Sequence, residues 1–502
     1  MANNMKKIIE DKWFYFGIVV LSLYFLIRII DESKILFMFP LDYTNDYASH
    51  IAKLFFLDKC EMFNICQYWY NGIDIFSMYP PGWFLFTLPI YYLTKNLLYS
   101  TFISELLLFF IGFLIINYFG RKFNMSFVRR IAFFALYFFN AISIGNFIRL
   151  GRMPEMFAWV NFLAFAFLML YFIDKKLDWR FIFISIFYAL IAISHQTTAI
   201  LSSILFLSLF LAKKGKERLI VVLSGLLALA LSSWWWVRYL MNVKEGSALT
   251  YVLSRWLLDF KTLLYENITA IILPLACLIL FYFYIKGKSK EQKLFFVPVI
   301  AITVLVLTRI IIFVPVFNYV YTDPYLYFIM FFAVFFLMKA EMPKQMYALA
   351  AIGLVLMPVA SIAINELHTP YFKDYSERQK NAVEIIDYID GRFFIDSYEQ
   401  YKTYSELLED KDALFAKAFY SLAATKGKYG AGGWNEQFVS KEYNKLVNLR
   451  FVTRGCEQMK NDLNTLNATE IIVFDEDCTI LKNCGFKEKK TIGDACLYEA
   501  DS

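Results

Sequence analysis

Long apolar runs recur along residues 1–365 of this chain, and they constrain its fold more than any motif does. Many of them reach the ~18–20 residues that a helix needs to cross a ~30 Å hydrocarbon core. Hydrophobic residues make up 59% of the sequence, against roughly 45–50% in soluble domains. These runs predict a polytopic α-helical membrane protein.

The apolar runs predict about eleven transmembrane helices. They lie at 13–30, 101–119, 131–147, 156–173, 181–194, 198–211, 219–236, 268–285, 294–313, 324–338 and 345–365. Alternate loops between them carry clusters of Lys and Arg, as at 121–130 and 213–218, and such clusters favour the cytoplasmic side. This bias predicts a multi-pass protein of the cell membrane, with a cytoplasmic N-terminus and an extracytoplasmic tail. It explains the basic residues without any nucleic-acid partner.

Two segments of the first outer loop (31–100) need separate treatment. Residues 81–94 are apolar enough to enter the bilayer, but a span there would move the basic loop 121–130 to the outer side. We therefore expect a re-entrant or interface-lying helix that protein buries. Residues 46–57 have the pattern of an amphipathic helix lying at the membrane interface.

The tail mixes charged and apolar residues as soluble α/β domains do. It predicts a helix at 374–389, strands at 392–395 and 470–474, a short helix at 479–484 and a closing strand at 495–499. The chain therefore divides into a membrane domain, 1–365, and an extracytoplasmic α/β domain, 366–502.

Six of the seven cysteines fall on the predicted outer side, where disulfides form. They are Cys60, Cys66, Cys456, Cys478, Cys484 and Cys496. Spacing does not fix their pairing, and buried free thiols remain an equal alternative.

The first outer loop holds the acidic residues best suited to catalysis. Asp42, Asp46 and His50 lie within nine residues, and in a helix Asp46 and His50 share one face. A carboxylate at a lipid–water boundary is partly desolvated, which raises its pKa and suits a general base. The alternative is that Asp46 caps the helix and that His50 is an ordinary interfacial residue.

Charged residues at the predicted outer ends of the spans form a second group of candidates. Such residues are costly near hydrocarbon, and guanidinium groups there suit a lipid-linked phosphate. The alternative is snorkelling to phospholipid headgroups or, for His195, a structural role. The group contains Arg149, Arg152, Glu155, His195, Arg238, Arg309 and Asp323.

Two further motifs are open to more than one interpretation. Tyr79-Pro80-Pro81 opens the segment 81–94, where aromatic residues usually anchor a chain at the membrane boundary. A glycine-rich stretch of the tail, 427–436, includes Trp434 and does not match a phosphate-binding loop. It either shapes a sugar or acceptor surface or is a plain loop.

These motifs, in their order along the chain, resemble those of the GT-C superfamily of integral-membrane glycosyltransferases. The segment 46–50 is similar to a D-x-x-x-H pattern after the first span, and 79–81 resembles a Y-P-P segment. Gly432-Gly433-Trp434 resembles the G-G-W element of a prokaryotic subgroup, the 6-pyruvoyl-tetrahydropterin-synthase-related membrane proteins. The Asp-Glu pair of protein O-mannosyltransferases and the W-W-D-Y-G motif of oligosaccharyltransferases are lacking, so the acceptor class does not carry over.

The resemblance implies a glycosyltransferase that moves a hexosyl or mannosyl-type sugar from a polyprenyl-phosphate donor, with inversion, on the outer face. Asp46 would be the general base, with Asp42 beside it as base or metal ligand. Some relatives use Mg²⁺ or Mn²⁺ and others use no ion. The acceptor would be a glycan, a lipid or a protein of the cell envelope. Candidate ligands of the donor and acceptor are His50, Arg149, Arg152, Glu155, His195, Arg238, Arg309 and Trp434.

Two other classes of protein remain open alternatives. A transporter places ionisable residues near the middle of the bilayer, often within internal repeats. Here most ionisable residues gather at one face and no repeat is evident, although Glu105 lies inside a predicted span. A non-catalytic scaffold or sensor with a partner-binding tail is the other alternative.

Overall fold

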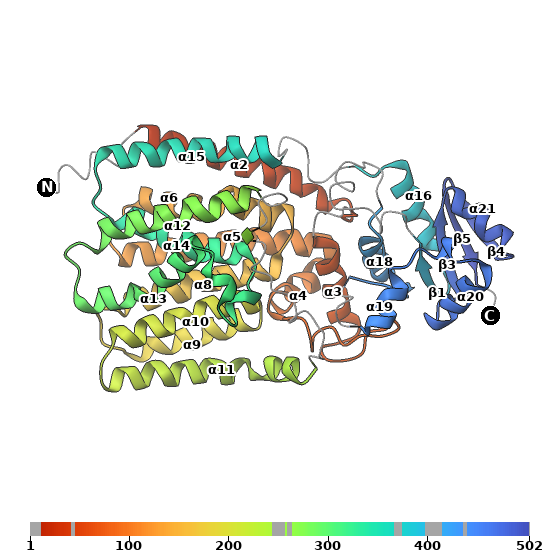
Figure 1. Cartoon of the computed structure of the whole chain (residues 1–502), viewed down its shortest axis with the longest axis horizontal. Coiled ribbons are helices and arrows are strands. Elements are labelled where there is room, and N and C mark those ends of the chain that lie inside the picture. Colours follow the sequence, from red (N-terminus) through yellow and green to blue (C-terminus); the bar gives the residue numbers. More distant parts are fainter. Residues whose placement is uncertain are drawn as a thin grey trace.

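The computed structural model describes residues 12–41, 46–242, 257–258, 264–365, 374–396, 414–434 and 439–500. A bundle of long helices forms one part of the molecule, and a smaller domain with a five-stranded sheet forms the other (Figure 1). This arrangement confirms the predicted class, a polytopic helical protein with a C-terminal α/β domain.

Every predicted span coincides with a helical segment of the bundle. The segments are α2 (Lys12–Glu32), α5 (Leu97–Lys122), α6 (Phe127–Phe138) with α7 (Ala141–Ser143) and η2 (Ile144–Arg149), α8 (Met153–Tyr171), α9 (Ile182–Ala192), α10 (Gln196–Ala212), α11 (Lys216–Asn242), α12 (Leu264–Ile285), α13 (Lys290–Leu307), α14 (Thr322–Lys339) and α15 (Lys344–Asn365).

Not all of these helices are long enough to cross a membrane. Within the described ranges, six are both long and apolar enough, and the pair α6 and α7–η2, bent by 48°, would make a seventh. The six are α2, α5, α8, α11, α12 and α14. Helix α9 has 11 residues and α10 has 17, fewer than the ~20 that a complete span requires.

Helices α8 and α14 form the centre of the bundle and are buried along almost their whole length. Their aromatic rings pack against each other, with Trp159 5.3 Å from Tyr327 and Phe162 5.5 Å from Phe331 between ring centroids. The outer helices expose apolar side chains, such as Leu23 of α2 and Leu226 of α11. Lipid chains replace water at such a surface.

The segment between α2 and α5, which we name the first loop, carries η1 (Ser33–Leu36), α3 (Tyr47–Lys59) and α4 (Gly82–Thr94). Helix α4 has 13 residues, about 20 Å at 1.5 Å per residue, and is too short for a ~30 Å hydrocarbon core. It packs on α3, α5 and α8. The first turn of α4 is buried, whereas Tyr92 and Leu93 near its C-terminal end are exposed. A re-entrant or interface-lying placement of α4 stays a prediction.

The surface-lying character predicted for 46–57 is wrong, although the helix itself is confirmed as α3. Every residue of 47–57 is buried, because α4 and helix α18 (Ala416–Thr425) of the tail both pack on α3. Its mostly apolar residues therefore face protein on all sides.

The tail is a mixed sheet with helices around it. The strands are β1 (Arg392–Ile395), β2 (Tyr429–Gly430), β3 (Glu470–Phe474), β4 (Lys487–Ile492) and β5 (Ala495–Glu499). Their order is β2-β1-β3-β5-β4, with β2, β1 and β3 parallel and β5 antiparallel to β3 and β4. The other elements are α16 (Glu377–Ile385), η8 (Ile386–Tyr388), α19 (Lys441–Val447), η11 (Phe451–Thr453), α20 (Cys456–Thr465) and α21 (Glu476–Asn483).

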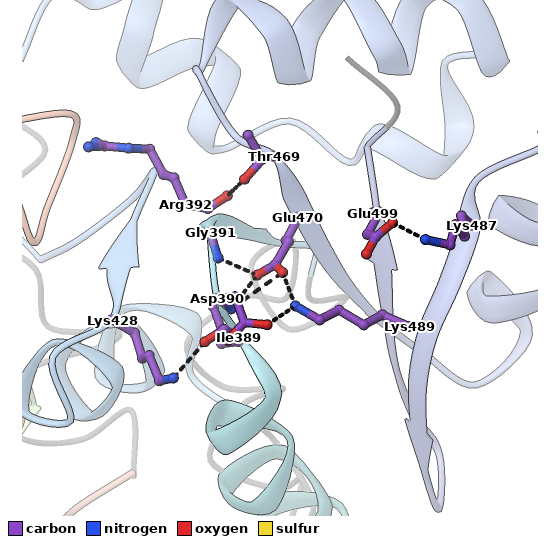
Figure 2. A network of polar contacts seen from close by, with 10 residues as sticks. All are labelled: Ile389, Asp390, Gly391, Arg392, Lys428, Thr469, Glu470, Lys487, Lys489 and Glu499. Atoms are coloured by element: carbon purple, nitrogen blue, oxygen red, sulfur yellow. Dashed lines mark hydrogen bonds and ion pairs between the residues drawn. The ribbon is translucent and has the colours of Figure 1, made fainter.

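A network of polar contacts joins the starts of β1 and β3 (Figure 2). The Glu470 carboxylate, which is almost fully buried, accepts hydrogen bonds from the backbone N–H groups of Asp390 (3.2 Å) and Gly391 (3.1 Å). The Lys489 ammonium of β4 lies between Asp390 (2.7 Å) and Glu470 (2.5 Å). These contacts fix the register of the parallel pair.

The six cysteines of the predicted outer side form three disulfides, which settles the open alternative. Cys60 pairs with Cys66 inside the first loop, Cys456 with Cys484, and Cys478 with Cys496. The Cys456–Cys484 bond ties α20 to the C-terminal end of α21, and the Cys478–Cys496 bond ties α21 to β5.

The tail is docked on the first loop, and Figure 1 shows α3 and α4 at the end of the bundle that faces α18 and α19. The N–H of Gly430 donates to the carbonyl of Tyr68 (2.9 Å), and the Asn71 amide donates to the carbonyl of Leu466 (2.9 Å). A side chain at Gly433 would place its Cβ 2.6 Å from Trp69. The glycine-rich stretch thus allows the close approach of the tail to the first loop.

Candidate active site

Asp46 lies directly before α3, and its side chain makes no capping hydrogen bond. Its backbone N–H donates to the carbonyl of Leu150 (2.6 Å), which joins the start of α3 to the segment leading into α8. Burial raises the pKa of Asp46, while the positive charges of Arg152 and Lys53 partly offset this rise. The carboxylate is therefore held near two cations and is not used as a helix cap.

Ser49, His50 and Lys53 follow Asp46 on one face of α3, because residues three, four and seven positions apart share a helix face. The Lys53 ammonium is buried, donates to the Ser49 hydroxyl (2.7 Å) and lies 3.7 Å from the centre of the Tyr79 ring. Burial lowers the pKa of Lys53 to about 7, against the opposing charge of Asp46. Burial also lowers the pKa of His50, so its imidazole is neutral.

Arg152 lies at the N-terminus of α8 and faces two carboxylates. Its guanidinium forms an ion pair with Asp323 of α14 and lies 3.8 Å from Glu155 of α8. The Asn146 amide donates to the same carboxylate of Asp323 (2.7 Å), and Trp159 donates to Glu155 (3.0 Å). Arg152 is therefore held in a fixed orientation by α8, α14 and η2.

Tyr79, in the first loop before α4, and His195, directly before α10, also border the site. Tyr79 is near enough to Asp46, Arg152 and Glu155 for their charges to affect it. The His195 imidazole bonds with the Thr198 hydroxyl (2.8 Å), and burial lowers the pKa of His195 to about 3. Gly82 donates to the carbonyl of Ile193 (2.8 Å), and a Cβ at Gly82 would lie 2.1 Å from the Ser194 hydroxyl. The residues after Tyr79 are thus pressed against the turn that carries His195.

Other predicted site residues have different surroundings. Arg238 is exposed on α11, 4.3 Å from the centre of the Phe63 ring. Arg309 donates to the carbonyls of Asn267 (3.0 Å) and Ala270 (3.3 Å) on α12, and Trp434 packs against Phe415 at 5.2 Å between ring centroids. Their assignment as substrate ligands stays a prediction.

Two predicted site residues remain to be placed. Arg149 is the last residue of η2, three positions before Arg152. Asp42, the predicted second acid, lies outside the residues that the structure describes.

Lys53 was not among the residues predicted for the site, and Tyr79 was predicted only to anchor the chain at the membrane boundary. A lysine within the apolar stretch 51–57, seven positions after Asp46, was the available signal. The Y-P-P segment pointed to Tyr79 but not to this contact, because only the folded first loop brings its ring over α3.

Asp42 and Asp46 were the predicted ligands of a divalent metal ion, and Asp42 lies outside the described residues. Across the ranges that the structure describes, no group of three or more His, Cys, Asp or Glu residues is arranged to hold a metal. Arg152 already occupies Asp323, and we assign no step to a metal ion.

Similar folds occur among solved structures. The arabinofuranosyltransferase AftD from Mycobacteria matches with a TM-score of 0.58 at 12% identity, over 98% of this chain and 40% of that chain. ArnT from Cupriavidus metallidurans in the apo state matches with a TM-score of 0.50 at 12% identity, over 96% of this chain and 97% of that chain. The chain thus spans about two fifths of AftD and almost all of ArnT. No protein-family model and no curated protein matches the sequence.

At such low identity the likeness concerns the fold, and it agrees with the resemblance of the sequence motifs. Both the helical bundle and the tail take part, since the matches cover nearly the whole chain. This chain therefore shares its fold with AftD and ArnT.

Proposed function

We propose that this protein transfers a sugar from a polyprenyl-phosphate donor to an acceptor hydroxyl, with inversion at the anomeric carbon. The observation that carries the proposal is the Asp46 carboxylate, which caps no helix and lies near enough to Arg152 and Lys53 for their positive charges to lower its pKa. A fold alone does not define an activity, and it is this constellation of side chains that supports glycosyl transfer.

Asp46 would act as the general base. The acceptor oxygen attacks the anomeric carbon from the face opposite the phosphate, and its proton passes to an oxygen of Asp46. The bond between the anomeric carbon and the phosphate oxygen breaks, and its electron pair leaves with polyprenyl phosphate. Burial suits Asp46 to this role, because a raised pKa makes the carboxylate a stronger base.

Arg152 and Lys53 would receive the phosphate. Asp323, Glu155 and Asn146 fix the orientation of Arg152 before the donor arrives, and a guanidinium has further N–H donors for a ligand. Such pre-oriented cations stabilise charge that develops on a leaving phosphate. His50 and His195, being neutral, would contribute hydrogen bonds and no positive charge.

We further propose that the chain has the two-domain arrangement predicted from the sequence. Residues 1–365 would form the membrane domain, with the first outer loop at the site of transfer, and 366–502 an extracytoplasmic domain. The lipid-linked donor would approach along the bilayer, and the acceptor would enter from outside the cell membrane.

The test is donor consumption by the purified protein and its Asp46→Asn variant in native lipid. With labelled polyprenyl-phosphate sugars, we expect the variant to lose roughly two or more orders of magnitude of turnover, because it lacks the base. Asp58→Asn is the matched control, since Asp58 lies at the opposite end of α3 and contacts Lys59. Equal turnover in the Asp46→Asn variant would exclude Asp46 as the base. Transfer to an acceptor with retained anomeric configuration would exclude inversion.

A further inference from the structure

Two glutamates and a tyrosine from three helices meet inside the bundle, behind the candidate active site. Glu32 ends α2, Tyr47 begins α3, and Glu105 lies on α5. All three side chains are 0% exposed. The Tyr47 hydroxyl is hydrogen-bonded to Glu32 and lies 3.1 Å from a carboxylate oxygen of Glu105.

Two backbone carbonyls complete the surroundings of this hydroxyl. The carbonyl oxygens of Phe147 and Ile148 lie 3.0 Å and 3.2 Å from it. Both belong to η2, a π-helical turn, and such turns occur frequently at functional sites. The phenolic oxygen therefore faces four oxygen acceptors.

The number of protons in this cluster is constrained by hydrogen bonding. A tyrosine hydroxyl has one proton to donate, and an ionised carboxylate can only accept. If both glutamates were ionised, one proton would have to satisfy four acceptors in a site closed to water. Glu105 and Asp31 act on Glu32 as like charges, and Tyr47 acts on it as a hydrogen-bond donor. Protonated carboxyl groups supply the missing donors, because each adds one O–H.

The cluster is joined directly to the candidate active site. Asp46 precedes Tyr47 in the chain, and its N–H donates to the carbonyl of Leu150. The Tyr47 ring lies against Gly151, where a Cβ would come within 2.4 Å of the ring and where φ is +64°. Gly151 precedes Arg152. The contacts of Tyr47 thus hold the start of α3, with Asp46, against the start of α8, with Arg152.

We propose that Glu32 and Glu105 share protons with Tyr47 as an uncharged cluster, and that Tyr47, Glu32 and Glu105 are positioning residues for Asp46. The positioning part rests on the proposed function, whereas the protonation of the cluster does not. The ionisable residue found inside a predicted span, Glu105, then needs no transport role.

Infrared spectroscopy tests the protonation directly. The full-length protein in lipid at neutral pH should show the C=O stretch of a buried carboxylic acid, and Glu105→Gln or Glu32→Gln should remove or shift it. Asp31→Asn is the matched control, since Asp31 neighbours the cluster and pairs with Arg28. Absence of this band from the parent protein would overturn the uncharged cluster.

Two readouts test the positioning role. In Tyr47→Phe, which keeps the ring on Gly151, we expect faster amide exchange at the start of α3. We also expect kcat for donor consumption to fall roughly tenfold to a hundredfold through misplacement of Asp46. Glu105→Gln should keep most activity, because its amide can donate where the acid did, and Glu105→Ala should not.

Unchanged exchange and unchanged kcat in Tyr47→Phe would overturn the positioning role. If the parent protein consumes no donor, the proposed function fails by itself. The infrared band and the exchange rates would still decide whether the cluster is uncharged and whether it holds α3.

Discussion

Lys53 is a buried residue whose ammonium interacts electrostatically with the proposed base, Asp46. Its ammonium is covered by the Tyr79 ring and bonded to Ser49, and the charge of Asp46 partly offsets the fall of its pKa to about 7. In return, the positive charge of Lys53 lowers the pKa of Asp46. The ionised form of the base therefore depends on a residue two helical turns away.

Replacing Lys53 by Met should change the pH dependence of donor consumption. Without the positive charge the pKa of Asp46 rises further, so Asp46 becomes ionised only at higher pH. We expect the acidic limb of the kcat/KM profile to move to higher pH in Lys53→Met and to stay near its original place in Lys53→Arg. The measurement is a set of pH–rate profiles for the three proteins. An unmoved acidic limb in Lys53→Met would mean that Asp46 ionisation does not control the rate.

At the scale of single elements, the helices and strands that could be predicted from the sequence were those with a clear pattern of apolar residues. Strands β1 and β3 are short runs buried on both faces, and both matched their predicted bounds. Strand β4, Lys487–Ile492, was missed because its charged residues show no apolar alternation. It is an edge strand, where lysines discourage pairing with another chain. Helix α3 was found, but its burial was not, since its covering partner α18 is distant in sequence.

Two of the three lysines of β4, Lys487 and Lys489, offer a matched pair for testing the network of Figure 2. Lys489 compensates the buried Glu470, whereas Lys487 pairs with the more exposed Glu499 (2.8 Å). Lys489→Met should destabilise the tail by about 1–3 kcal/mol, because a buried carboxylate loses its partner. Lys487→Met should destabilise the tail much less, because exposed ion pairs contribute little to stability. Hydrogen exchange of the β3 amides in the full-length protein measures the difference. Equal exchange in the two variants would contradict it.

At the scale of the whole molecule, the candidate site is assembled from segments far apart in sequence. The motif at 46–50 and the charges at 152, 155 and 195 pointed to some of its members, because each type of residue is costly at a membrane boundary. The ion pair between Arg152 and Asp323 was beyond prediction, since it joins α8 to α14 across the bundle centre. Arg238 and Arg309 carried the same sequence signal, yet they lie against Phe63 and the carbonyls of α12.

The docking of the tail on the first loop leads to a test that spans the whole molecule. Trp69 of the first loop is fully buried and donates to the carbonyl of Tyr420 in the tail (3.4 Å). It therefore has little space in which to move away from an added methyl group. Gly433→Ala should therefore weaken the interface by about 1–3 kcal/mol, as overpacking does. Because the first loop also carries α3 and Asp46, donor turnover should fall although Gly433 belongs to the tail.

The matched control is Gly353→Ala on the exposed side of α15, where an added Cβ meets nothing within 4 Å. We expect Gly433→Ala, and not Gly353→Ala, to speed amide exchange around Trp69 and to lower kcat. Faster exchange with unchanged kcat would mean that the tail stabilises the first loop without affecting catalysis. If exchange is also unchanged, the interface tolerates a side chain at Gly433, and the close approach of tail and first loop does not depend on this glycine.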